Sequence, residues 1–190
     1  EKNIVHVIDK AKKFADATNA LVVDDPMDMK TDVGPLVNKD GLAQIEAQVH
    51  DAINKGAKVL TGGKKLERKG FFYKPTVLSN IKNDMKVVTE EVFGPVAPII
   101  VVDNEEEAIK VANNSEFGLG ASIWTSDEAK GFEIAKRIEA GDVFINSIVK
   151  SDPRMPFGGI KKSGIGRELS KYGLKEFVNI KGINVYEVKK

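Results

Sequence analysis

The amino-acid sequence predicts an α/β fold, in which helices form a layer on each face of a mostly parallel sheet (a three-layer α/β/α arrangement). Residues 96–102 form a continuous apolar run, as expected of a strand buried on both faces. After this run, short apolar segments alternate with segments of helical periodicity. Such alternation is typical of right-handed βαβ units in a parallel sheet. At 190 residues the chain is long enough for one sizeable domain with a hydrophobic core.

The first part of the chain predicts two helices and two strands. Residues 5–17 have helical periodicity. A second helix is expected over residues 40–54, because its apolar side chains recur every three or four positions. Gly56 follows that helix, at the place where glycine commonly ends one. Residues 58–60 and 72–78 are expected to be strands.

The second part continues the alternation of helices and strands. Glutamates at 105–107 favour a helix start, since acidic groups interact favourably with the helix dipole there. Ser126 is expected to cap a helix that ends near Glu139. The other expected elements are strands over 121–125 and 142–146, a helix over 167–177 and a strand over 178–186.

Composition narrows the possible partners. The 29 basic and 28 acidic residues leave a net charge of +1, so neither nucleic acid nor an anionic membrane is favoured. No apolar run approaches the about 20 residues that span a bilayer. With no cysteine, disulfides and thiolate metal sites are excluded, and the two histidines lack a ligand pattern, so no metal site is expected. Cytoplasm is the expected location.

Two motifs are the most informative feature of the chain. The first is Thr89-Glu-Glu-Val-Phe-Gly-Pro95, and the second is Pro156-Phe-Gly-Gly-Ile-Lys-Lys-Ser-Gly-Ile-Gly-Arg-Glu168. A carboxylate such as Glu91 can accept hydrogen bonds from both hydroxyls of a ribose. Phe93, next to a Gly-Pro bend, can support a flat ring such as nicotinamide. The structural alternatives are a solvated carboxylate for Glu91 and a core aromatic for Phe93.

Together the motifs resemble the C-terminal part of the aldehyde dehydrogenase superfamily. The resemblance covers nearly the whole chain and is loose only over the first thirty or so residues. It is closest to the branch of succinate-semialdehyde, lactaldehyde and glyceraldehyde dehydrogenases, to which Ser151-Asp-Pro-Arg154 ahead of Pro156-Phe-Gly-Gly159 points. The other matching segments are Gly34-Pro-Leu36, Gly62-Gly63, Phe71-Phe-Tyr-Lys-Pro-Thr-Val77, Ala112-Asn-Asn-Ser-Glu-Phe-Gly-Leu119 and Phe144-Ile-Asn146.

The resemblance implies an NAD- or NADP-dependent enzyme that oxidises a small aldehyde to a carboxylic acid through a cysteine thiolate. It implies that Glu91 holds the nicotinamide ribose, that Phe93 packs against the same part of the cofactor, and that Phe157 forms a wall of the substrate tunnel. Core packing is the alternative for Phe157. By resemblance, residues 1–176 belong to the catalytic domain, and residues 177–190 form an exported strand that joins a sheet bridging subunits of a homo-oligomer.

Several family features have no match here. The chain has no cysteine and no Glu-Leu-Gly-Gly motif, and neither Gly118-Leu-Gly120 nor Gly164-Ile-Gly166 has the third glycine of a dinucleotide fingerprint. No residue is therefore assigned as catalytic. The chain is expected to be a C-terminal fragment of a longer enzyme, inactive alone. The alternative is a non-catalytic domain that keeps only the fold and the oligomerisation strand.

The loop that follows the strand at 142–146 is expected to bind the substrate, because ligands on such sheets sit at the carboxyl ends of strands. Ser151 and Arg154 supply a hydroxyl and a guanidinium there, which suit an aldehyde with a distal carboxylate, such as succinate semialdehyde. Asp152 opposes this assignment, because it would repel that carboxylate or pair with Arg154. Lactaldehyde and glyceraldehyde are the alternatives.

Overall fold

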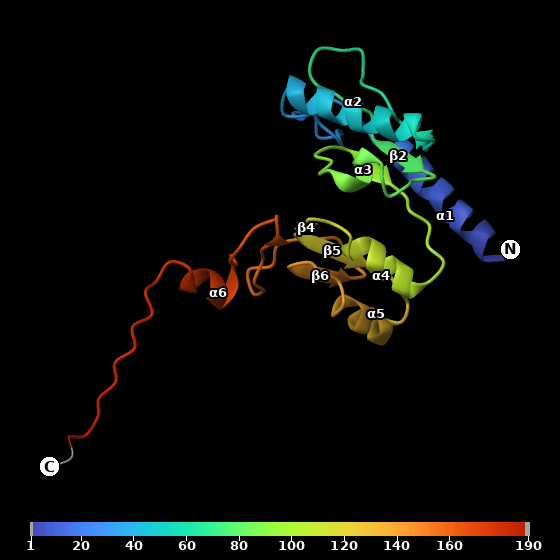
Figure 1. Cartoon of the computed structure of the whole chain (residues 1–190). Coiled ribbons are helices and arrows are strands. Elements are labelled where there is room, and N and C mark those ends of the chain that lie inside the picture. Colours follow the sequence, from blue (N-terminus) through green and yellow to red (C-terminus); the bar gives the residue numbers. More distant parts are fainter. Residues whose placement is uncertain (1, 189–190) are drawn as a thin grey trace. The chain divides into compact units, whose positions relative to one another are not determined.

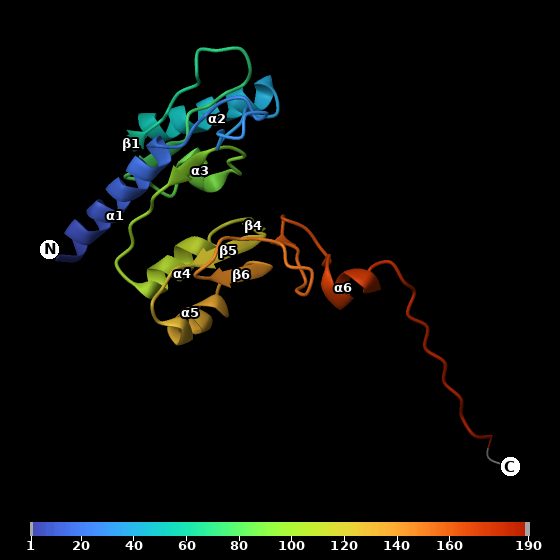
Figure 2. The same ribbon diagram turned by 180° about the vertical axis from the view of Figure 1, so that it is seen from behind.

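The computed structural model describes residues 2–188, and it describes side chains from residue 9 onward. The chain forms two compact units, Glu1–Val101 and Val102–Lys190. Both units contain helices and strands, so the α/β class is confirmed (Figures 1 and 2). We call them unit 1 and unit 2. No helix within residues 2–188 combines the length and apolar character that a membrane crossing requires.

Unit 1 packs helices against a three-stranded sheet of order β1-β2-β3. β1 and β2 are antiparallel, whereas β2 and β3 are parallel. The expected helix over 40–54 is confirmed as α2, and the side chain of Asn38 caps it by accepting from the Gly41 N–H at 2.8 Å. The elements are α1 (Lys2–Asn19), α2 (Lys39–Asn54), β1 (Lys58–Thr61), β2 (Thr76–Ser79), α3 (Lys86–Thr89) and β3 (Val96–Pro98).

The core of unit 1 forms between α2, β2 and α3. Apolar residues one helical turn apart on α2 enter it, which is the pattern that predicts the helix. Its buried members are Ile45, Val49, Ala52, Ala57, Tyr73, Leu78, Met85 and Val87.

Two strands of unit 1 are shorter than expected. The strand predicted over 72–78 begins only at Thr76, because Pro75 has no N–H to donate and Tyr73 makes a separate bridge to Lys65. The strand predicted over 96–102 ends at Pro98 and is only half-buried. Its expected burial on both faces is wrong for this chain, because β3 pairs with β2 alone and lies at the sheet edge.

Unit 2 contains one clear βαβ unit. β5 and β6 pair in parallel over four residues, and α5 connects them, as the alternation predicts. β4 and β7 form a separate antiparallel pair. The elements are α4 (Glu105–Asn113), β4 (Phe117–Gly118), β5 (Gly120–Ile123), α5 (Glu128–Ala135), β6 (Asp142–Ile145), β7 (Ile160–Lys161) and α6 (Ser170–Lys175).

Both ends of α5 differ from the prediction. Asp127, not Ser126, caps it: its backbone has the extended conformation of an N-cap residue, and its side chain accepts from the Lys130 N–H at 2.9 Å. The helix ends at Ala135, since the bond from Arg137 N–H to the Ile134 carbonyl closes a tighter turn.

The C-terminal segment also differs from the prediction. α6 begins at Ser170 and not at 167, because Glu168 makes a two-way backbone bridge with Phe157 instead. Residues 178–188 have no strand partner among the described residues, and Ile180 and Ile183 are 82% and 79% exposed. The strand predicted over 178–186 is therefore not formed among the described residues of this single chain.

The strands of residues 2–188 form three small sheets in place of one. Two of the four pairings are parallel, β2–β3 and β5–β6, and two are antiparallel. Within residues 2–188 the strands do not form a continuous, mostly parallel sheet.

Candidate functional site

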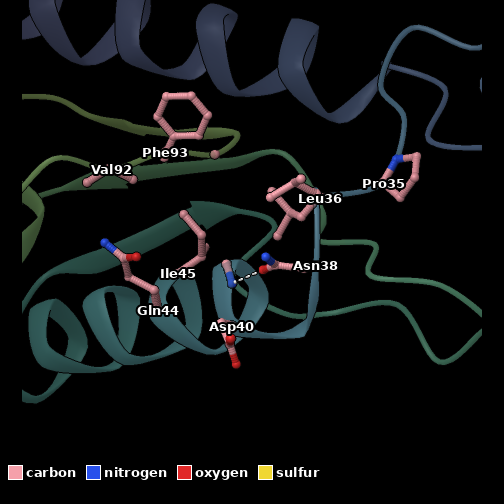
Figure 3. Close-up of a pocket in the computed structure, with 11 residues that line it drawn as sticks. Pro35, Leu36, Asn38, Asp40, Gln44, Ile45, Val92 and Phe93 are labelled. Atoms are coloured by element: carbon pink, nitrogen blue, oxygen red, sulfur yellow. Dashed lines mark hydrogen bonds between the residues drawn. The ribbon is translucent and has the colours of Figure 1, made fainter.

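A groove of about 750 Å³ opens on unit 1 between α2 and the segment after α3 (Figure 3). Gln44 and Ile45 rise from α2 toward the segment that carries Val92 and Phe93. Most of the lining is apolar, which is typical of small-molecule sites. The lining residues are Pro35, Leu36, Val37, Asn38, Asp40, Gly41, Gln44, Ile45, Val92, Phe93 and Gly94.

Gly94 allows the segment to lie directly on α2. A Cβ at this position would lie 2.6 Å from Cδ1 of Ile45 and 3.4 Å from Cδ2 of Leu36. Any side chain at this position would force the Ile45 side chain to move or would shift the segment away from the helix. The glycine of the first motif therefore fixes the depth at which Val92 and Phe93 stand over the groove.

Phe93 of the first motif lines this groove, and Glu91 lies two residues before it on the same segment. Glu91 is exposed, and its carbonyl oxygen accepts from the Nε2 groups of Gln48 at 3.0 Å and Gln44 at 3.5 Å. Phe93 lines the groove and is 76% exposed, so the alternative that makes it a core aromatic is wrong. An acceptor and an exposed aromatic ring are thus held two residues apart.

Sequence reasoning missed Gln48. Its side chain is fully buried and donates to Glu90 Oε2 at 3.1 Å as well as to the Glu91 carbonyl. The available signal was a polar residue next to Val49 on the apolar face of a predicted helix. The wall at residues 35–41 was also missed as a site, although its Gly34-Pro-Leu36 segment belongs to the resemblance.

Ser151 and Arg154 lie in one exposed loop of unit 2. The Arg154 guanidinium forms a two-pronged ion pair with Asp152, through Nε–Oδ1 at 2.9 Å and Nη2–Oδ2 at 2.7 Å. This pairing lowers the pKa of the Asp152 carboxyl and raises the pKa of Arg154. Of the two roles considered for Arg154, the structure shows the pairing with its neighbour.

Phe157 is half-buried, and its backbone is fixed on both sides. Its N–H donates to the Glu168 carbonyl at 2.9 Å, and its carbonyl accepts from the Glu168 N–H at 2.8 Å. The glycines that follow serve backbone packing, as expected: a Cβ on Gly159 would lie 2.5 Å from Cβ of Ser163. Unit 2 therefore holds Ser151, Arg154 and Phe157, whereas Glu91 and Phe93 belong to unit 1.

Ionisable side chains do not suggest a metal centre in this part of the protein. Among the side chains that the structure describes, no three His, Cys, Asp or Glu residues gather closely enough to hold an ion. The groove offers an apolar floor and an exposed aromatic ring, and the exposed residue Glu91 supplies a carboxylate on the segment that carries that ring. These groups fit a sugar attached to a flat ring.

Comparison with known proteins agrees with this reading. The profile described as "Aldehyde dehydrogenase family" matches residues 6–183. The chain belongs to the aldehyde dehydrogenase family.

Individual relatives within this family are similar to nearly the whole of this chain. Over 175 residues the chain is 49% identical to "Succinate-semialdehyde dehydrogenase [NADP(+)] 1" of Mycobacterium tuberculosis, covering 92% of this chain and 38% of that protein. An "Aldehyde dehydrogenase" of Paenarthrobacter nicotinovorans is 49% identical over 85% of this chain and 35% of its own length. The chain thus spans less than two fifths of the length of these relatives.

Solved structures support the same fold. An NADP-dependent enzyme of E. coli superposes with a TM-score of 0.88 at 41% identity, over 92% of this chain and 37% of that one. Betaine aldehyde dehydrogenase from Staphylococcus aureus, solved with NAD+, gives a TM-score of 0.83 at 35% identity, over 87% and 34%.

Proposed function

We propose that this chain is part of an NAD(P)-dependent aldehyde dehydrogenase that oxidises succinate semialdehyde to succinate. The observation that carries the proposal is the segment after α3, in which Val92 and Phe93 line the unit 1 groove directly after Glu91, in a chain of this family. The relatives named for succinate semialdehyde support the substrate, and their names support NADP as one cofactor.

In this proposal unit 1 supplies the nicotinamide end of the cofactor site. The Glu91 carboxylate accepts from the two ribose hydroxyls, and the exposed face of Phe93 supports the nicotinamide ring. When bound, NAD or NADP accepts the hydride that leaves the aldehyde carbon. The apolar floor at Leu36 and Ile45 excludes water from that end of the groove.

The nucleophile has to come from residues that this chain does not contain, since it has no cysteine. Attack on an aldehyde carbonyl needs an activated thiolate or an equivalent group before hydride can depart. We therefore expect the 190-residue chain alone to show no aldehyde oxidation. Turnover of any aldehyde with NAD or NADP by the purified chain would contradict this expectation.

Unit 2 contributes the proposed substrate loop with Ser151, Arg154 and Phe157. Ser151 offers a hydroxyl, and Arg154 offers a guanidinium that has to be shared with Asp152 to reach a substrate carboxylate. Phe157 supplies a half-buried aromatic surface on a fixed backbone. Lactaldehyde or glyceraldehyde oxidation is the second candidate, favoured by the Asp152–Arg154 pair, since a neutral substrate needs only hydroxyl-directed bonds.

The substrate assignment is tested in the full-length enzyme by measuring kcat/KM for succinate semialdehyde, lactaldehyde and glyceraldehyde side by side. The proposal predicts at least a tenfold preference for succinate semialdehyde, about 1.4 kcal/mol in transition-state binding. A tenfold preference for either hydroxyaldehyde would show that Arg154 serves only its pairing with Asp152. A chain that acts as a non-catalytic domain would give no full-length activity with any of the three.

Cofactor binding is tested separately with Glu91→Gln in the full-length enzyme. Losing an ionised acceptor for two hydroxyl bonds is expected to cost about 1.5–3 kcal/mol in the bound complex. Cofactor KM should rise or the hydride step should slow, with the melting temperature retained. Unchanged kinetics with both cofactors would remove Glu91 from the site.

The same proposal extends to assembly and location. The exposed tail at 178–186 becomes a strand in a sheet that bridges subunits of a homo-oligomer, and the parallel pairs β2–β3 and β5–β6 join a larger three-layer fold in the full-length enzyme. Residues 1–176 then belong to the catalytic domain, and residues 177–190 form the oligomerisation strand. The cytoplasm is the proposed location.

A further inference from the structure

The Gln48 side chain binds both glutamates of the first motif, Glu90 and Glu91. Its Nε2 group donates one hydrogen bond to the Glu91 carbonyl oxygen at 3.0 Å and another to Glu90 Oε2 at 3.1 Å. The other carboxylate oxygen of Glu90 pairs with Lys86 Nζ at 3.7 Å. The peptide that carries Glu91 is therefore fixed from α2 on one side and from α3 on the other.

The environment of Gln48 indicates that its two N–H groups matter more than its oxygen. The side chain is 0% exposed, and Oε1 has no hydrogen-bond partner among the described residues. An unpaired buried acceptor costs free energy. Exchanging the amide nitrogen and oxygen would place an acceptor against two other acceptors, so the partners fix the orientation.

Besides the Gln48 bond, the Glu91 carbonyl accepts a longer bond from Gln44 Nε2 at 3.5 Å, and the Pro95 carbonyl accepts from the Thr76 N–H at 2.8 Å. Residues 90–95 lie in no helix or strand, and Glu91 itself is exposed. A carboxylate that must meet two ribose hydroxyls at once needs a fixed backbone, because small misplacements weaken both bonds. The Gln48 carboxamide supplies that fixation within hydrogen-bonding distance of the residue concerned.

We propose that Gln48, together with Glu90, is a positioning residue that presents the Glu91 carboxylate to the cofactor ribose. The proposal rests on the proposed function, since it requires Glu91 to bind the ribose. It gives Glu90 a role: its carboxylate ties the Gln48 amide and Lys86 together next to Glu91.

In this arrangement the effect of Gln48 on the position of Glu91 can be distinguished from its effect on the stability of the fold. Glu90 is exposed, so water can solvate its carboxylate when Gln48 is changed, and the Glu91 carbonyl keeps the bond from Gln44 Nε2. Gln48→Leu also removes the unpaired oxygen. The substitution should therefore disturb cofactor use more than folding.

The test compares Gln48→Leu with Val49→Ala in the full-length enzyme. Val49 is 1% exposed on the same helix and makes none of the bonds to Glu90 or Glu91, so it is a matched core control. We expect Gln48→Leu to raise cofactor KM or slow single-turnover hydride transfer about tenfold, with a smaller fall in melting temperature than Val49→Ala causes. Gln48→Glu, which keeps the shape and replaces donors with acceptors, should lose more than Gln48→Leu.

A double-mutant cycle with Glu91→Gln decides between the roles. If Gln48 acts through Glu91, Gln48→Leu adds no further loss of cofactor kinetics in the Glu91→Gln background. Two outcomes overturn the positioning role while leaving the ribose contact intact, provided that Glu91→Gln itself impairs cofactor use. In the first, Gln48→Leu leaves the cofactor kinetics unchanged. In the second, the losses of the two single variants multiply in the double variant. Unchanged kinetics in Glu91→Gln overturns both the ribose contact and the positioning role.

Discussion

The two units use their apolar residues differently. Unit 1 encloses a core in which Ile45, Leu78 and Met85 are 0–1% exposed. In unit 2, Ile109 is the buried residue with a large apolar side chain among those described, and the other buried positions are Gly118, Gly131, Gly159 and Gly173. Unit 1 therefore rests on side-chain packing, whereas unit 2 rests largely on close backbone contacts.

Large apolar side chains lie on the surface of unit 2. Trp124 and Ile148 are both 68% exposed, and Ile165 is fully exposed. Because unit 2 buries few large side chains, we expect unit 1 to be the more self-sufficient folding unit.

The largest expected effect on the unfolding free energy comes from a substitution in the core of unit 1. Leu78→Ala should cost about 2–5 kcal/mol of unfolding free energy, because a fully buried side chain leaves a cavity. Trp124→Ala in the isolated chain should change the unfolding free energy by no more than about 0.5 kcal/mol. Denaturant unfolding followed by circular dichroism measures both. Equal losses of unfolding free energy in Leu78→Ala and Trp124→Ala would contradict the difference in side-chain packing between unit 1 and unit 2.

Alkaline pH should weaken unit 1 through Tyr73. Burial raises the pKa of this hydroxyl to about 12, and the charge of Glu46 adds to the shift. The folded state thus keeps a proton that the unfolded state loses near its ordinary pKa of about 10, so stability falls as the pH rises from about 10 to about 12. The loss should reach about 2–3 kcal/mol.

Tyr73→Phe is the matched variant for this titration. It should flatten the alkaline loss of stability seen by circular dichroism. The fluorescence of Trp124, the chain's single tryptophan, reports on unit 2 over the same pH range. A wild-type stability that stays constant to pH 12 would show that Tyr73 is not held protonated.

The tail of unit 2 should control association. Ile183→Lys places a charge on an exposed apolar segment that offers unpaired backbone groups, so we expect at least tenfold weaker self-association, about 1.4 kcal/mol. Asn184→Lys adds the same charge at the neighbouring position and serves as the control. Light scattering over a concentration series measures the effect, and a wild-type chain that stays monomeric throughout would contradict it.

A smaller effect on stability is expected at the start of α5, where Asp127 caps the helix and the neighbouring Ser126 does not. Asp127→Ala should cost about 1 kcal/mol, because its carboxylate accepts from the Lys130 N–H at the start of α5. Ser126→Ala should leave the unfolding free energy unchanged, since Ser126 does not cap the helix. Thermal unfolding of the two variants compares them directly, and a larger loss in Ser126→Ala would reverse the assignment.

Local patterns predicted much of this fold correctly. The apolar spacing over 40–54 gave α2, and the acidic start at 105–107 gave α4 within one residue. Strand ends were predicted less well. The strand predicted from residue 72 begins only after Pro75, which has no N–H to donate, and the strand predicted over 96–102 ends at Pro98, followed by one more bond from the Ile99 N–H to the Leu78 carbonyl at 2.8 Å.

The candidate site was predicted in part for similar reasons. The first motif predicts Glu91 and Phe93 as cofactor-binding residues, because a carboxylate, an aromatic ring and a Gly-Pro bend occur together in a short segment, and Phe93 lines the groove. Gln48 lies 43 residues upstream of Glu91, and only the folded chain shows that its amide reaches the motif. A single sequence carries no signal for such a long-range hydrogen bond beyond a polar residue on an apolar helix face.

The smallest effect on stability is expected at the substrate loop of unit 2. Asp152 and Arg154 are paired at the surface, where ion pairs contribute little to stability, so Asp152→Asn should not change the melting temperature. It should nevertheless weaken the hold on the guanidinium. If Arg154 binds the distal carboxylate, kcat/KM of the full-length enzyme for succinate semialdehyde rises severalfold, and Arg154→Gln lowers it. Lactaldehyde, which lacks that carboxylate, provides the control and should respond to neither change. A response to lactaldehyde alone would assign the loop to hydroxyl recognition and leave Arg154 as a partner of Asp152.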